Sequence, residues 1–96
     1  MMKLAKLRAS LLDQGIDALL ITNDYNRRYM TGFTGTAGVA IVSQHDAVFI
    51  TDFRYTEQAA AQVKDFRIVQ HTGTIFAEVA NQVAQMNIQT LGFEKN

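Results

Sequence analysis

The sequence contains no cysteine, no proline and no tryptophan. Without cysteine the chain has no disulfide, no thiolate metal site and no cysteine nucleophile, which is typical of a cytoplasmic protein. Its longest apolar runs have the length of strands and fall far short of the roughly 20 residues that span a bilayer. The amino terminus follows a helical pattern and lacks the apolar centre of a signal peptide. We therefore expect a soluble, cytoplasmic protein that does not enter a membrane.

An excess of charge of either sign is also missing. Nine basic residues balance nine acidic ones, so the formal net charge is zero. Nucleic acids and anionic membranes select proteins with a basic excess, so neither is expected as a partner. The 96 residues, 48% hydrophobic and 19% charged, suit one globular domain with a single core.

The spacing of apolar residues predicts four helices and five strands. The helices are expected over 3–14, 25–30, 53–63 and 75–86, and the strands over 18–21, 39–43, 47–51, 66–70 and 90–93. Asn23 or Asp24 can cap the second helix, Asp52 or a neighbour the third, and Thr72 or Thr74 the last. The last helix carries an apolar stripe of Ile75, Phe76, Val79, Ala80, Val83 and Met86.

The order of these elements predicts the fold class. Strands separated by helices imply parallel pairs, whereas the short connection 44–46 between two strands imposes an antiparallel hairpin. We therefore predict a layered α/β domain in which helices flank a mixed sheet.

Most candidate sites for chemistry have simple structural explanations. The glycine segment 32–38 lacks a lysine and runs into a strand, whereas phosphate loops run into a helix. We expect its glycines to adopt positive φ in a tight loop. His45 and His71 fall in a turn and after a strand, and no cluster of metal ligands accompanies them. The carboxylates lie mainly at strand ends and caps, so the residues alone display no active site.

Arg54 is the exception, because it follows a predicted strand directly, within Thr51-Asp52-Phe53-Arg54-Tyr55. Functional groups in α/β folds gather at such strand ends, and the planar guanidinium suits a carboxylate. We expect Asp52 to be either a helix cap or a partner of Arg54.

Three segments resemble a known family. Residues 26–38, NRRYMTGFTGTAG, resemble the N-x-R-Y-[LM]-T-G-F-T-G-[ST]-A-G segment of creatinase/prolidase-type amino-terminal domains. Residues 51–59, TDFRYTEQA, resemble the family's T-D-x-R-Y-x-x-Q-A, and residues 91–94 resemble its L-G-F-E strand. Together, in this order, they cover essentially the whole chain and are most similar to bacterial Xaa-Pro dipeptidases and aminopeptidases P.

The resemblance implies a two-domain metallopeptidase. The amino-terminal domain of such enzymes is a three-layer, ribonuclease-H-like α/β structure. A following "pita-bread" domain holds two Mn²⁺ or similar divalent ions and hydrolyses the peptide bond before proline. Residues 1–96 are then expected to be the amino-terminal domain, shortened at its carboxyl end and without the catalytic domain. We accordingly expect no catalytic residue, no metal ligand and no cofactor in this chain.

The resemblance also implies partners and binding residues. The amino-terminal domain is expected to contact its own carboxyl-terminal catalytic domain, to support a homodimer, and to wall the active site around a proline-containing peptide. Arg54, Phe33 and Thr34 match positions expected to bind substrate.

Two other functions remain open from the sequence: a free-standing small-molecule-binding or interaction module, and an independent ribonuclease-H-like hydrolase or nuclease. The last would require clustered carboxylates. The motifs also do not separate a dipeptidase from an aminopeptidase that acts on longer peptides.

Overall fold

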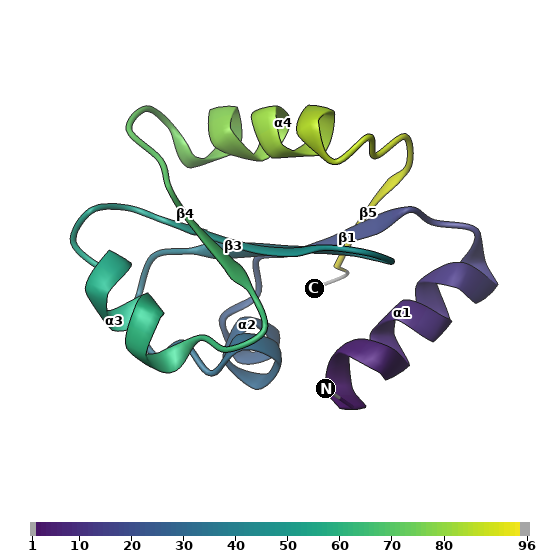
Figure 1. Ribbon diagram of the computed structural model, residues 1–96, viewed down its shortest axis with the longest axis horizontal. Helices are drawn as coiled ribbons and strands as arrows, with labels where there is room; N and C mark the ends of the chain where they lie inside the picture. Colours follow the sequence, from purple (N-terminus) through teal and green to yellow (C-terminus); the bar gives the residue numbers. More distant parts are fainter. Residues whose placement is uncertain (1, 95–96) are drawn as a thin grey trace.

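The computed structural model describes residues 2–94, which form one five-stranded sheet with helices on both faces (Figure 1). The helices are α1 (Met2–Gln14), α2 (Asp24–Thr31), α3 (Thr56–Gln62) and α4 (Ile75–Gln85). The strands are β1 (Ala18–Ile21), β2 (Val39–Ser43), β3 (Ala47–Thr51), β4 (Arg67–Gln70) and β5 (Leu91–Phe93). None of the helices in this described part is long and apolar enough to cross a membrane.

The sheet has the order β4-β3-β2-β1-β5 and is mixed, as the sequence predicts. β2 pairs antiparallel with both β1 and β3, while β1 pairs parallel with β5 and β3 with β4. The hairpin connection falls at residues 44–46, as expected. Every residue of β3 is buried, because this strand is covered by helices on both faces and flanked by strands on both sides.

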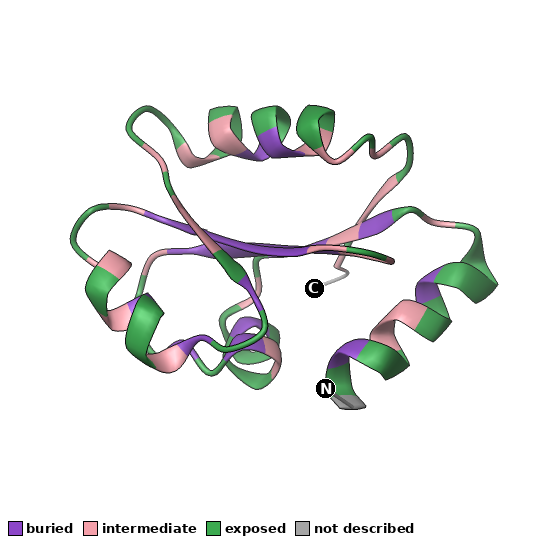
Figure 2. Ribbon diagram, in the orientation of Figure 1, coloured by how far each residue is buried: buried purple, intermediate pink, exposed green. Residues whose placement is uncertain are grey.

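The helices divide the core into two layers. In Figure 1, α1, α2 and α3 lie below the sheet and α4 lies above it. Figure 2 shows the buried residues concentrated along the middle of the sheet and on the helix sides that face it. On the lower side Phe33 packs against Phe49, with ring centroids 4.7 Å apart. On the upper side Val79 of α4 belongs to a buried cluster that also contains Ile41 and Val48.

Several caps follow the sequence prediction. The Asn23 side chain accepts a hydrogen bond from the Asn26 amide at 3.1 Å, and Gly32 ends α2 with a left-handed φ of 81°. The Thr74 hydroxyl accepts from the Ala77 amide at 3.1 Å at the start of α4. These side chains satisfy backbone groups that helix ends leave without an intrahelical partner.

The predicted apolar stripe of α4 is partly wrong. Phe76 is 63% exposed and Ala80 is also exposed, whereas Ile75, Val79, Val83 and Met86 belong to the upper core, as predicted. The buried face of α4 also includes a polar residue, Gln82, whose side-chain amide bonds to Arg67 and Glu78. The prediction is therefore wrong for Phe76 and Ala80, and it missed the buried position of Gln82.

The glycine loop needs two of its glycines for close packing rather than for positive φ. Among the three glycines of residues 32–38, only Gly32 has a positive φ. A Cβ at Gly38 would lie 2.5 Å from Cζ of Phe49, and a Cβ at Gly35 would overlap the Phe33 ring. The expectation of positive φ throughout the loop is thus wrong for Gly35 and Gly38, whose missing side chains admit core aromatic rings.

Candidate binding site beside the glycine loop

A tight turn after β3 places Arg54 at the surface. The predicted helix over 53–63 is shorter, since residues 53–55 form this turn and α3 begins at Thr56. Asp52 caps the turn and not the helix, because its Oδ1 accepts from the Arg54 amide at 3.0 Å. The same carboxylate accepts from Arg54 Nε at 3.0 Å and from Nη2 at 2.8 Å. Of the two roles expected for Asp52, helix cap or partner of Arg54, the structure shows the second.

The electrostatics of this pair favour both charged forms. The side-chain hydrogen bonds from Arg54 hold the pKa of Asp52 below its ordinary value, and Asp52 raises the pKa of Arg54. The Arg54 side chain is 59% exposed, and no residue in 2–94 accepts a hydrogen bond from its Nη1. Arg54 is thus fixed by Asp52 on one edge and open to an anionic group on another.

Tyr55 joins this turn to the glycine loop. The guanidinium carbon of Arg54 lies 5.1 Å from the centroid of the Tyr55 ring. The Tyr55 hydroxyl hydrogen-bonds the Thr36 hydroxyl at 2.7 Å, and its ring meets that of Phe33 edge to face, with centroids 5.7 Å apart. These contacts place Arg54 and the glycine loop on one surface.

The other two predicted substrate-binding residues differ in exposure. Thr34 is exposed, its amide donates to Gln62 Oε1 at 3.0 Å, and its hydroxyl accepts from Gln62 Nε2 at 3.0 Å. Phe33 is fully buried and supports the loop from beneath. The structure therefore brings Arg54, Thr34 and Phe33 to one region, with Arg54 and Thr34 accessible to a solute.

Arg27 is a structural residue of the site that the sequence prediction did not single out. Its side chain is only 6% exposed, and it donates through Nη1 to the Gly38 carbonyl and through Nη2 to the Gly35 carbonyl, each at 2.9 Å. Asp24 lies 3.2 Å from its Nη2. The helical spacing offers one signal of its burial: Arg27 stands four residues before Thr31 on the same face of α2, and both residues are buried.

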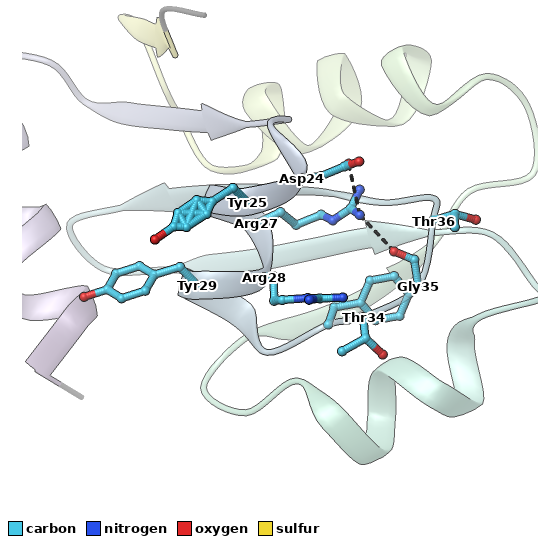
Figure 3. A pocket seen from close by; sticks show the side chains of 9 residues that line it. Asp24, Tyr25, Arg27, Arg28, Tyr29, Thr34, Gly35 and Thr36 are labelled. Atoms are coloured by element: carbon cyan, nitrogen blue, oxygen red, sulfur yellow. Dashed lines mark hydrogen bonds and ion pairs between the residues drawn. The ribbon is translucent and has the colours of Figure 1, made fainter.

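The two hydrogen bonds from Arg27 to the Gly35 and Gly38 carbonyls form a clamp on the glycine loop, and a groove of about 600 Å³ runs beside this loop clamp (Figure 3). Its lining residues come from α2 and the glycine loop: Asp24, Tyr25, Arg27, Arg28, Tyr29, Phe33, Thr34, Gly35 and Thr36. Figure 3 shows Arg28 extending toward the loop, whereas Tyr25 and Tyr29 extend away from it.

Metal-ligating side chains do not converge in residues 2–94, where no group of three His, Cys, Asp or Glu could hold an ion. His45 lies in the connection between β2 and β3. His71 follows β4, where its Nδ1 lies 2.9 Å from the Gly73 carbonyl oxygen. A metal therefore does not fit the described residues of this chain.

The comparisons with known proteins identify the family. Residues 3–96 match the Creatinase/Prolidase N-terminal domain. The chain is 55% identical to Uncharacterized peptidase YqhT of Bacillus subtilis (strain 168), covering 99% of this chain and 27% of that protein. The solved Xaa-Pro dipeptidase from Bacillus anthracis superposes with a TM-score of 0.95 at 54% identity, covering 98% of this chain and 26% of the other.

A third relative is a domain on its own. The N-terminal domain of the cytoplasmic peptidase PepQ from Mycobacterium tuberculosis H37Rv matches with a TM-score of 0.87 at 35% identity, covering 97% of this chain and 72% of that one. The chain belongs to the creatinase/prolidase N-terminal domain family, whose relatives include Xaa-Pro dipeptidases and aminopeptidases P. It spans about a quarter of the length of the two peptidases above.

Proposed function

We propose that this chain is the non-catalytic amino-terminal domain of a cytoplasmic, dinuclear-metal Xaa-Pro dipeptidase, continued in the whole protein by a catalytic domain. In this proposal the second domain holds two divalent ions, such as Mn²⁺, and hydrolyses the bond before proline. The domain described above supports a homodimer and forms one wall of the active site. The observation that carries the proposal is the match along residues 3–96 to the amino-terminal domain family.

The placement of Arg54 supports a role at that wall. Its side chain is exposed, and its guanidinium is oriented by Asp52 through two hydrogen bonds and linked through Tyr55 to the glycine loop. A peptide substrate carries a carboxylate, which an arginine can bind through paired, charge-assisted hydrogen bonds. We assign Arg54 the recognition of that carboxylate, Thr34 a polar contact beside it, and Phe33 the support of the loop.

The test uses the full-length protein that contains this chain. Hydrolysis of Xaa-Pro dipeptides and of an Xaa-Pro-Xaa tripeptide is measured with Mn²⁺ for the wild type and for Arg54→Ala. Loss of one charge-assisted contact lowers kcat/KM by about tenfold to a hundredfold. Arg54→Lys keeps the charge without the planar fork and should fall between the two.

Lys64→Ala is the matched control, because Lys64 is an exposed cation at the end of α3 and outside the site. Unchanged kcat/KM in Arg54→Ala would remove Arg54 from the substrate wall. An inactive wild-type protein would instead contradict the peptidase assignment. The ratio between dipeptide and tripeptide rates distinguishes a dipeptidase from an aminopeptidase.

A further inference from the structure

The L-G-F-E segment at residues 91–94 ends in a carboxylate that binds a distant part of the chain. Because β1 and β5 run parallel, the residue that follows β5 lies beside the connection from β1 to α2. Oε1 of Glu94 accepts from the Thr22 amide at 2.7 Å and from the Asn23 amide at 2.8 Å, and its Oε2 accepts from Nδ2 of Asn26 at 2.6 Å. One half-buried carboxylate therefore holds three donors from a segment 68 to 72 residues earlier in the chain.

These bonds complete the cap at the start of α2. In a capping box the N-cap side chain accepts from the amide three residues later, and a Glu or Gln at that later position accepts from the N-cap amide. Asn23 makes the first of these bonds with the Asn26 amide, but Asn26 is shorter than the usual Glu or Gln, and its Nδ2 donates to Glu94. Glu94 supplies the missing acceptor from outside the helix, and its negative charge suits the dipole at this helix end.

The orientation of α2 depends on such polar anchors. The helix has 8 residues, and helices this short are marginal without tertiary contacts. Its two buried residues, Arg27 and Thr31, are both polar. Arg27 in turn donates to the Gly35 and Gly38 carbonyls, each at 2.9 Å (Figure 3). A shift at the start of α2 would therefore move the guanidinium that fixes the glycine loop.

We propose that Glu94 is a positioning residue for the substrate wall, which it aligns through α2. This inference rests on the proposed function above, in which Thr34 of the glycine loop and Arg54 beside it contact the peptide. The loop is joined to the Arg54 turn by the Thr36–Tyr55 hydrogen bond of 2.7 Å, so a displaced loop disturbs the carboxylate site as well. Glu94 is not among the residues that line the groove beside the loop, and its effect on substrate is therefore indirect.

The test uses the full-length protein and measures kcat and KM for an Xaa-Pro dipeptide with Mn²⁺. Glu94→Ala removes the acceptor of both backbone amides, and we expect KM to rise by about threefold to tenfold. The value of kcat should change by less than about twofold, because the wall binds substrate and transition state alike. Glu94→Gln keeps an acceptor oxygen at the same reach and should recover most of the loss. Asp13→Asn is the matched control, because Asp13 is an exposed carboxylate of α1, and it should behave like the wild type.

A double-mutant cycle separates positioning from a general loss of stability. If Glu94 acts through the wall, Glu94→Ala should raise KM by less than about twofold in the Arg54→Ala background. Circular dichroism checks that each variant is folded, and Glu94→Gln keeps the comparison possible if Glu94→Ala does not fold. Equal fold-changes in the two backgrounds, an unchanged KM in Glu94→Ala, or a Glu94→Gln variant as impaired as Glu94→Ala would overturn the proposal. An inactive wild-type protein would instead contradict the proposed function itself, and with it the substrate role of Glu94.

Discussion

Gly38→Ala tests how the glycine loop is seated on the core. The added Cβ would lie 2.5 Å from Cζ and 3.2 Å from Cε1 and Cε2 of Phe49. Phe49 is fully buried and packs against Phe33, so its ring cannot swing into solvent. Either the ring or the backbone of the loop must therefore shift.

The expected cost follows from this overlap. Forcing an extra methyl group into a packed core typically destabilises a protein by about 1–3 kcal/mol. For a domain of this size, that free energy lowers the melting temperature by about 4–8 °C per kcal/mol. A shift of the loop also strains the bond from Arg27 to the Gly38 carbonyl, which places the cost toward the upper part of the range.

Urea unfolding followed by circular dichroism measures the free energy of unfolding directly. Gly73→Ala is the matched control, because a Cβ there meets nothing within 4 Å and Gly73 has no positive φ. We expect the control to change stability by less than about 0.5 kcal/mol. Equal stability of the two variants would refute the packing argument for Gly38.

Three further predictions concern the same region. Arg27→Met should reduce the free energy of unfolding, measured in urea, by about 1–3 kcal/mol, because the Gly35 and Gly38 carbonyls lose their buried donor. The control Arg28→Met, at an exposed site, should change that free energy by less than about 0.5 kcal/mol. Equal losses of stability in the two variants would contradict the structural role of Arg27. Tyr55→Phe should cost about 0.5–1.5 kcal/mol through loss of the bond to Thr36, and unchanged stability would show that bond to be unimportant. In an NMR titration, the pKa of Asp52 should lie below its ordinary value and rise toward it in Arg54→Gln, which removes the side-chain hydrogen bonds but keeps the bond from the backbone amide of residue 54. Because the pKa of Asp52 is lower in the folded than in the unfolded chain, the pair stabilises the fold at pH values above the unfolded pKa, and this contribution is lost as the pH falls through the folded pKa. An unaltered titration of Asp52 in Arg54→Gln would contradict the pairing.

The sequence predicts the fold well where local signals and burial agree. The β2–β3 hairpin appears at the expected residues because two β-branched runs flank a short polar connection. The caps at Asn23 and Thr74 are likewise local, since each side chain bonds to an amide three residues later. Such features depend on few distant contacts.

The sequence predictions fail where contacts between distant segments determine the structure. The exposure of Phe76 depends on how α4 is rotated over the sheet, which apolar spacing alone does not determine. The requirement for glycine at position 38 comes from Phe49, which is distant along the chain. The start of α3 shifts because Asp52 bonds to Arg54 within the preceding turn.

The candidate site is predictable in part. The position of Arg54 after a strand indicates a surface cation, and the pairing with Asp52 was one of two open interpretations. Arg27 and Arg28 are adjacent and identical in type, yet one is buried in the loop clamp and the other is exposed. Only the orientation of α2 against the glycine loop distinguishes their roles.

The central claim is that this domain serves a peptidase whose catalytic groups lie elsewhere. The most direct measurement replaces the matching segment of the Bacillus anthracis Xaa-Pro dipeptidase with this chain, and compares Mn²⁺-dependent Xaa-Pro hydrolysis by the chimera and by the chain alone. The account predicts an active chimera, a lower kcat/KM when it carries Arg54→Ala, and no hydrolysis by the chain alone. Hydrolysis by the chain alone, or a folded chimera without activity, would contradict it.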